Sequence, residues 1–281
     1  TRFNGEVDIS LEHSIDNIPI HTPQVSIESV ASGGGSILSI EDGLLKVGPE
    51  SSGSYPGPIC YGFDGTLSLS DANLVLGRLQ PQLINPCFGP NRDEPLDISL
   101  AHKGFEKLLQ THPELEFHSV EELAESFVMV ANQKMSQPIL EVSIAKGYDV
   151  KKHNLVCFGA AAGQHACQIA KDLDLKKVLI HSQGGLLSAA GLLAACPEDY
   201  KFRYIGKCID SVALPEDILD SEHVSVLCRY SNTNTLLKIN WHPVTNLKNR
   251  FEKAFRKQFG FVHKDVKIII EHAVLHHSEN E

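Results

Sequence analysis

The sequence has no run of about 18 consecutive apolar residues, the length that a membrane-spanning helix needs. It also has no excess of basic residues, since 25 Lys and Arg stand against 35 Asp and Glu and give a formal net charge of −10. Nucleic acid attracts a basic surface, so neither nucleic acid nor a membrane is expected as a partner. The residues after Thr1 lack the apolar core and the small-residue cleavage site of a secretory signal, so we expect no such signal there.

Cysteine spacings typical of metal or redox sites are also missing. The seven cysteines stand at positions 60, 87, 157, 167, 196, 208 and 228, without a C-x-x-C pair. This odd, scattered set indicates reduced thiols in the cytosol rather than a disulfide framework. Cys157, Cys167 and Cys196 lie in apolar segments, where we expect them to pack as small hydrophobic side chains rather than act as nucleophiles.

The fourteen histidines form no recognisable metal-binding pattern. His272, His276 and His277 cluster near the C-terminus, but without an H-E-x-x-H motif or a Cys/His ligand set. A solvated tail is therefore favoured over a metal site.

What the chain does contain is a globular composition, 42% hydrophobic and 21% charged, which excludes a disordered chain. Its 281 residues fit one large domain or two smaller ones. Toward the N-terminus the pattern predicts a strand over 24–30. A hairpin with strands 38–40 and 44–47 is predicted around the turn Glu41-Asp42-Gly43, and the Pro- and Gly-rich segment 48–58 is predicted to be an irregular loop.

Helices are predicted from caps and from apolar spacing. Asp71 is expected to cap a helix over 72–79, and a Ser-Val-Glu-Glu capping box at 119–122 is expected to open another. Pro138 is expected to kink or split this second helix, because proline removes a backbone hydrogen bond. The chain then leaves the helix near Gly147, a predicted C-cap.

The clearest pattern in the chain alternates strands with helices. Buried strands are predicted over 154–158 and 177–180, followed by helices over 164–173 and 187–195. The small-residue loop Gly159-Ala160-Ala161-Ala162-Gly163 joins the first strand to the first helix. This β-α-β-α order predicts a parallel α/β core.

The C-terminal part is predicted to contain further strands and one basic amphipathic helix. The predicted strands are 224–227, 235–239 and 267–270, and the helix is 247–259.

The loop at 159–163 is a candidate ligand site. Small side chains between a strand and a helix let backbone N–H groups approach a ligand, and the helix N-terminus favours an anion. The loop is neither G-x-G-x-x-G nor a Walker motif, so neither a dinucleotide fold nor a P-loop enzyme is indicated. The alternative is a plain packed turn. His165, at the start of the next helix, is either a neutral capping group or a catalytic one.

Two other segments are open to two interpretations each. The loop Gly33-Gly34-Gly35-Ser36 either lines a ligand site with its backbone amides or is a flexible linker. Asp71 is either a helix cap or a carboxylate that faces a ligand or a metal.

Taken in order, several motifs resemble the hydantoinase A/oxoprolinase family, and within it the ATP-dependent oxoprolinases of eukaryotes. The motifs are Ala31-Ser32-Gly33-Gly34-Gly35-Ser36-Ile37, the segment from Gly48 to Gly62, Ser70 to Leu79, Leu155 to Cys167, and Gly185 to Leu192. The resemblance covers roughly Thr1 to Cys196, and residues 251–270 are similar to the family's later Phe-rich helix and strand.

The resemblance implies an α/β fold of the actin/sugar-kinase/heat-shock-ATPase (ribonuclease H-like) type, here incomplete, with a mixed sheet and flanking helices. It implies ATP in a cleft between two lobes, with Mg²⁺ bridging the phosphates. The candidate cofactor-binding residues are then Gly33, Gly34, Gly35, Ser36, Gly159, Ala160, Gly163, Gln164 and His165, and the candidate metal ligand is Asp71.

The implied reaction is the hydrolysis of 5-oxo-L-proline to L-glutamate with cleavage of ATP to ADP and phosphate, as in the γ-glutamyl cycle of glutathione metabolism. The implied partner is thus a small cyclic amide, and a cytosolic homodimer is expected for the complete enzyme. We expect residues 1–200 to form the nucleotide-binding core and residues 201–281 a C-terminal extension.

Two departures from the family pattern bear on these expectations. The family usually has Gly-Gly-Ala-Gly-Gly at 159–163, so two added methyl groups narrow the approach of a nucleotide here. An Asp-x-Gly-Gly-Thr phosphate loop of the family falls just before the point that matches Thr1, so we expect a fragment that is inactive alone. The alternatives are a hydantoinase or another cyclic-amide hydrolase, and a non-catalytic remnant of the fold.

Overall fold

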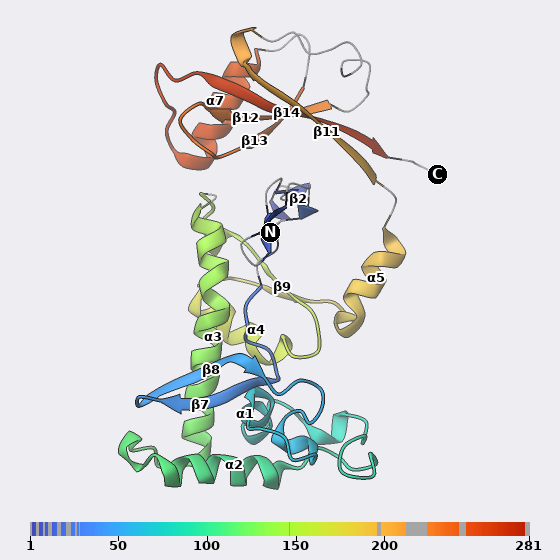
Figure 1. The fold of residues 1–281 in the computed structure, drawn as a ribbon, viewed down its shortest axis with the longest axis vertical. Coiled ribbons are helices and arrows are strands. Elements are labelled where there is room, and N and C mark those ends of the chain that lie inside the picture. Colours follow the sequence, from blue (N-terminus) through green and yellow to red (C-terminus); the bar gives the residue numbers. More distant parts are fainter. Residues whose placement is uncertain are drawn as a thin grey trace. The chain divides into compact units, whose positions relative to one another are not determined.

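We describe the protein from a computed structural model (Figure 1). The residues described are 29–145, 147–195, 198–211, 224–241 and 246–278, with Ile218 and short pieces of the first 27 residues. The chain divides into two compact units, one of residues 1–141 with 150–180 and one of residues 142–149 with 181–281. The main division, near residue 180, precedes the boundary at residue 200 that we expect from the sequence.

The first unit begins with short paired strands. They are β1 (Arg2–Phe3), β2 (Glu6–Val7), β3 (Ile9–Ser10), β4 (His13–Ile15), β5 (Ile18–Ile20) and β6 (Gln24–Val25), with antiparallel pairs β1–β2, β3–β6 and β4–β5. Of the strand predicted over 24–30, only β6 is found among the described residues. Ile27 and Val30 are 68% and 42% exposed, so the alternating pattern has no core to face there.

Next comes the predicted hairpin, formed by β7 (Ser36–Glu41) and β8 (Leu44–Ser51). Asp42 and Gly43 both have positive φ, 52° and 74°, as in the two-residue turns whose twist matches that of paired strands. β8 continues into the segment predicted to be an irregular loop, because it still has a partner there: Ser51 pairs with Ser36.

Three helices share a core with this hairpin: α1 (Leu69–Val75), α2 (Ile98–Thr111) and α3 (Val120–Ala145). Val47 of β8, Phe105 of α2 and Phe127 of α3 are fully buried in it. The 3-10 helices of the described ranges are η1 (Ile59–Tyr61), η2 (Pro81–Leu83), η3 (Pro113–Leu115), η4 (Val150–Lys152), η5 (Gly184–Leu186) and η6 (Ile209–Ser211).

The helix boundaries differ from the predicted ones in two places. α1 begins and ends earlier than the predicted 72–79, because its N-cap is Ser68 and not Asp71. α3 runs through Pro138 without a break, so the predicted split is wrong. Proline removes one backbone hydrogen bond of the helix, while a side-chain hydrogen bond of 2.7 Å from Gln137 Nε2 to Glu141 Oε1 spans the same turn. The predicted C-cap is present, since Gly147 has a φ of +68°.

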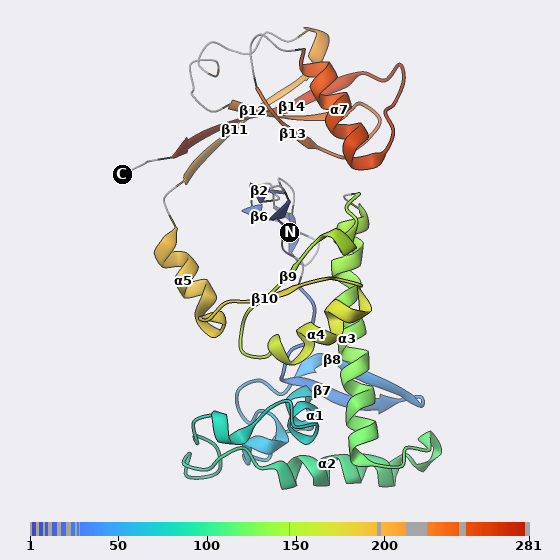
Figure 2. The same cartoon turned by 180° about the vertical axis from the view of Figure 1, so that it is seen from behind.

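The predicted β-α-β order follows as β9 (Leu155–Cys157), α4 (Gly163–Asp172) and β10 (Val178–Ile180). β9 and β10 are parallel, as expected, and lie next to each other in Figure 2. They are not buried as expected, since Val156 is 55% and Ile180 64% exposed. Successive side chains of a strand point to opposite faces, and α4 packs on this pair of strands, so Cys157 is buried while its neighbour Val156 is exposed.

The second unit contains α5 (Leu187–Ala194) and an antiparallel sheet covered by α7 (Leu247–Phe259). The strands are β11 (Glu198–Cys208), β12 (Val224–Tyr230), β13 (Leu237–Asn240) and β14 (Ile268–Ser278), in the order β11-β14-β12-β13. Phe251 and Phe255 of α7 place their ring centroids 5.0 and 4.9 Å from that of Tyr230 on β12. These aromatic rings form the centre of the unit's core.

The structure differs from the sequence-based expectations for this unit at two strands. The sequence pattern does not predict β11, which is an edge strand of the sheet. β14 extends to Ser278, so the histidines near its end lie in a strand and not in a solvated tail, and the His272 ring lies 5.5 Å from that of Tyr204.

Two further expectations concern the burial of the cysteines and the absence of a membrane-spanning helix. Cys157 is buried as expected, Cys167 is exposed on α4 because Ala166, Ile169 and Ala170 occupy its core side, and Cys196 lies outside the described residues. None of the helices in the described part of the chain has the length and apolarity to cross a bilayer.

Candidate functional site

An open hollow of about 350 Å³ lies where the loop before α4 meets the chain that follows α1. One wall comes from Ala160, Gly163 and Gln164, and the other from Arg78, Leu79, Gln80, Leu83 and Ile84. Both walls belong to the first unit. Three of the predicted site residues therefore line a common hollow.

The loop before α4 is shaped by its glycines. Gly159 has a φ of +88°, a conformation that side-chain-bearing residues rarely adopt. A Cβ added at Gly163 would meet no heavy atom within 4 Å, so the first turn of α4 faces open space. Helix N-termini carry partial positive charge and favour anions by about 0.3–1 kcal/mol. The loop is thus neither filled by neighbours nor turned away from the hollow.

Arg78, on the opposite wall, was not among the residues expected in a site. Its side chain is exposed and adds a full positive charge to the rim of the hollow. The backbone N–H groups of Arg78 and Leu79 donate to the Asn73 carbonyl, at 2.8 and 3.0 Å, which holds this wall to the end of α1. A hollow with a guanidinium, a helix N-terminus and an apolar side formed by Leu79 and Leu83 suits a ligand that has both an anionic and an apolar part.

His165 does not line the hollow but lies directly behind it. The ring is 2% exposed, with Nδ1 2.8 Å from Asn132 Oδ1 on α3 and Nε2 3.3 Å from Asn73 Nδ2 on α1. Burial, aided by the charge of Arg78, lowers the pKa of His165 to about 4. The ring is therefore neutral at physiological pH and tied to two asparagines, which corresponds to the neutral interpretation rather than the catalytic one.

The buried ring leads to a pH-dependence prediction. Between pH 6.5 and 4 the unfolded chain binds a proton at His165 that the folded chain excludes, so the free energy of unfolding falls as the pH falls through this window. At about 1.4 kcal/mol per unit of pKa shift, His165 contributes a loss of about 3 kcal/mol. Denaturant titrations at pH 7 and pH 4.5, with His165→Gln as the comparison, should show a shallower pH dependence in the variant. Equal slopes in the two proteins would contradict the prediction.

Asp71 is buried at the start of α1, where it stands at position N3 of a capping box with Ser68. Its Oδ2 accepts hydrogen bonds from Ser68 N at 2.7 Å, Ser68 Oγ at 2.9 Å and Ile59 N at 3.3 Å, and its Oδ1 accepts one from Cys60 N at 2.9 Å. Burial raises the pKa of this carboxyl, and the hydrogen bonds of Cys60 and Ser68 oppose the shift. Both oxygens are committed to protein donors, so Asp71 takes part in the capping box at position N3 and is not the N-cap that the sequence pattern predicts. A metal-ligand role stays a prediction that this geometry does not favour.

Replacement of Asp71 by Asn should destabilise the first unit by about 2–4 kcal/mol, because an amide nitrogen would face buried N–H donors. Hydrogen exchange of the amides in η1 and α1 would measure this loss. Asp97→Asn is the matched control: Asp97 caps α2 at a half-buried position, and asparagine caps a helix about as well as aspartate. Equal effects of the two substitutions would show that burial of Asp71 is not decisive.

The loop Gly33-Gly34-Gly35-Ser36 contributes no residue to the hollow. Gly34 O accepts a hydrogen bond of 2.8 Å from Ser70 N, and Gly35 O accepts one of 2.8 Å from Ser52 N. An added Cβ would lie 2.7 Å from Ser70 Oγ at Gly34, so glycine allows a close approach to α1. The flexible-linker interpretation is therefore wrong, and the contact of this loop with a nucleotide stays a prediction.

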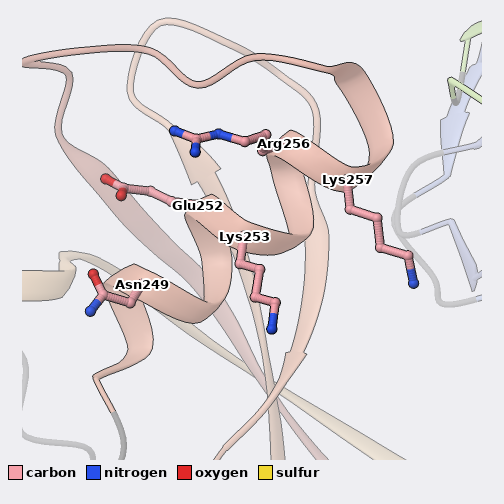
Figure 3. A pocket seen from close by; sticks show the side chains of 5 residues that line it. All are labelled: Asn249, Glu252, Lys253, Arg256 and Lys257. Carbon is pink, nitrogen blue, oxygen red and sulfur yellow. The ribbon is translucent and has the colours of Figure 1, made fainter.

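A second hollow, of about 390 Å³, lies on the exposed face of α7 in the other unit. It is lined by Asn249, Glu252, Lys253, Arg256 and Lys257, whose side chains are shown in Figure 3. No predicted site residue is among them. Within the described ranges, no group of three or more His, Cys, Asp or Glu side chains is placed to hold a metal ion.

Comparison with known proteins shows which family the chain is similar to. The sequence profile of the Hydantoinase/oxoprolinase family matches residues 1–200. The chain is 36% identical to "5-oxoprolinase" of Dictyostelium discoideum over 93% of its own length and 43% identical to "5-oxoprolinase 1" of Arabidopsis thaliana over 73%. It covers only 23% and 17% of these relatives.

A solved structure agrees with the sequence matches. The ATP-dependent caprolactamase of Pseudomonas jessenii superposes with a TM-score of 0.75 over 95% of this chain and 43% of its own, at 24% identity. This similarity confirms the expected mixed α/β fold class. Since the family profile spans residues 1–200 of 281, the chain belongs to the hydantoinase/oxoprolinase family.

Proposed function

We propose that this chain is the nucleotide-handling part of an ATP-dependent hydrolase of cyclic amides, with 5-oxo-L-proline as the substrate. The observation that carries the proposal is the hollow between the loop before α4 and the segment after α1. Relatives named 5-oxoprolinase match most of this chain, while the chain spans about a quarter of their length or less. The reaction as a whole therefore belongs to the longer protein that carries such a segment.

The proposed ligand of the hollow is ATP. The apolar side chains of Leu79, Leu83 and Ile84 suit the base and ribose, while Arg78 and the start of α4 supply positive charge for a phosphate. Gly163 leaves the space that this approach needs. Gly159, Ala160, Gly163 and Gln164 are then the binding residues of this segment.

Mg²⁺ would accompany ATP and neutralise phosphate charge during transfer of the phosphoryl group. The residues described offer no carboxylate cluster for it, and the oxygens of Asp71 are committed to hydrogen bonds. Mg²⁺ commonly keeps several waters and is held mainly by the phosphates of its nucleotide, and we propose this mode here. A cytosolic homodimer, acting on a small cyclic amide, completes the proposal.

Release of ADP that depends on 5-oxo-L-proline tests this function. The full-length protein should release ADP when 5-oxo-L-proline is added and not when L-proline, which has no ring amide, replaces it. The same assay on these 281 residues alone should show no turnover. Turnover by the isolated chain would exclude the fragment interpretation, and the absence of turnover from every longer form would exclude the enzyme.

A different lactam is a second candidate substrate, and the superposition on a caprolactamase favours it. No group among the described residues is assigned to recognition of the substrate ring. Only an assay with each substrate therefore distinguishes these candidates. Faster consumption of caprolactam or hydantoin than of 5-oxo-L-proline would favour this alternative.

A further inference from the structure

Both walls of the hollow are attached to one buried residue, Asn73. Its carbonyl accepts hydrogen bonds from the backbone N–H groups of Arg78 and Leu79, which belong to one wall. Its side-chain Nδ2 lies 3.3 Å from Nε2 of His165, which follows Gly163 and Gln164 of the other wall. The pair Asn73–His165 therefore connects the two walls from behind, without lining the hollow.

The direction of this hydrogen-bond chain is set by a backbone carbonyl. Asn73 Nδ2 lies 3.1 Å from the Leu69 carbonyl, which only accepts, so the amide nitrogen and not the oxygen points this way. The second hydrogen of that nitrogen is then donated to Nε2 of His165. Since Nε2 accepts, the proton of the neutral ring is on Nδ1, which donates to Asn132 Oδ1 at 2.8 Å. The Nδ1-protonated tautomer of His165 is thus consistent with all three hydrogen bonds.

Burial makes this arrangement rigid. Asn73 and Asn132 are each 1% exposed and His165 is 2% exposed, so water does not compete for these groups. Asn73 Oδ1 has no hydrogen-bond partner within the described part of the protein. The side-chain amide of Asn73 is therefore held only by the two hydrogen bonds that its nitrogen donates. A rotation of the amide by 180° would place its oxygen against the Leu69 carbonyl, which repels it.

We propose that Asn73 and His165 are positioning residues of the nucleotide site: their hydrogen bond fixes the first turn of α4 relative to Arg78 and Leu79. The inference rests on the proposed nucleotide role of the hollow. His165 then acts through the position of the wall and not through contact with the ligand. The bond to Asn132 anchors the ring to α3, while the bond to Asn73 sets the spacing of the walls.

Two substitutions of His165 separate these bonds. In His165→Gln the longer amide places its oxygen near the position of Nε2, so the acceptor for Asn73 is kept. In His165→Asn the shorter amide keeps the donor for Asn132 but does not reach Asn73. We expect His165→Asn to weaken ATP binding by the full-length protein about tenfold, the equivalent of one buried hydrogen bond, and His165→Gln to stay close to the wild type. Cys167→Ala, at an exposed position of the same helix, is the control.

Hydrogen exchange supplies a readout that does not need a nucleotide. The amides of Arg78 and Leu79 lie on the far wall, and they should exchange faster in His165→Asn than in the wild type, with protection restored in His165→Gln. If the wild type binds no ATP, the proposed function fails, while these exchange rates still decide the positioning role. Wild-type ATP affinity in His165→Asn, or unchanged exchange at both amides, would overturn the inference.

The tautomer of the wild-type ring gives a third measurement, which requires no variant to fold. Nitrogen-15 spectra should show a neutral His165 ring with the proton on Nδ1. A proton on Nε2 would remove the hydrogen bond from Asn73 and would overturn the proposed chain.

Discussion

Gly163→Val is expected to lower the affinity of the full-length protein for ATP by at least about 100-fold, or about 2.7 kcal/mol. The position tolerates a side chain within the fold, because an added Cβ meets no heavy atom within 4 Å. The new methyl groups instead enter the hollow that Gly163 lines and occupy the space proposed for the nucleotide. Calorimetric titration with ATP and Mg²⁺ measures the loss.

Cys167→Val is the matched control for this experiment. It places the same β-branched residue on an exposed position of α4 that does not line the hollow, so we expect wild-type affinity for ATP in this variant. Gly159→Val is a less specific test, since the φ of +88° at Gly159 strains any side-chain-bearing residue and affects folding as well. A folded Gly163→Val protein that binds ATP with wild-type affinity would remove this loop from the site.

Phe251→Ala is expected to lower the free energy of unfolding of the second unit by about 3–5 kcal/mol. Phe251 is fully buried, and its ring packs edge-on against Tyr230 and beside Phe255, so its removal leaves a cavity between α7 and β12. Trp241 is the only tryptophan of the chain and packs against this core. Its fluorescence therefore reports the unfolding of this unit in a denaturant titration.

Phe261→Ala provides the comparison for the core substitution. Phe261 is 52% exposed, although its ring lies 5.6 Å from that of Phe255. Most of its surface is already in water, so we expect a loss of about 1 kcal/mol or less. Similar losses for the two phenylalanines would mean that the cluster around Tyr230 does not hold α7 to the sheet.

Local patterns were sufficient for the elements whose causes are local. The Asp42-Gly43 turn set the hairpin, because both residues adopt positive φ with little strain. The apolar spacing of α7 is satisfied by a sheet that its own unit provides, and the loop at 159–163 is found between a strand and a helix as predicted. β11 has the alternating aromatic residues Tyr200, Phe202 and Tyr204, a signal that was present but that lies among charged residues of an edge strand.

The composition of the hollow was only partly predictable. Its α4 wall follows from the glycines and alanines of one short segment. Its other wall contains Arg78, which is separated in sequence from α4 by the whole of α2 and α3, and no spacing rule relates the two. Arg78 does lie within the motif Ser70–Leu79 that resembles the family, and this resemblance is the one signal that pointed to the segment.

The sequence alone determined the family, the α/β class, the hairpin, the glycine loop before α4 and the acidic balance of the chain, because periodicity, turn chemistry and motif order are properties of neighbouring residues. Tertiary structure alone decided that Asp71 faces inward, that Cys167 faces outward and that His165 is neutral. The state of His165 depends on burial and on partners distant in the chain: Asn73 is 92 positions from His165, and Asn132 is 33. Hydrogen bonds between such residues form only after the helices that carry them have packed together.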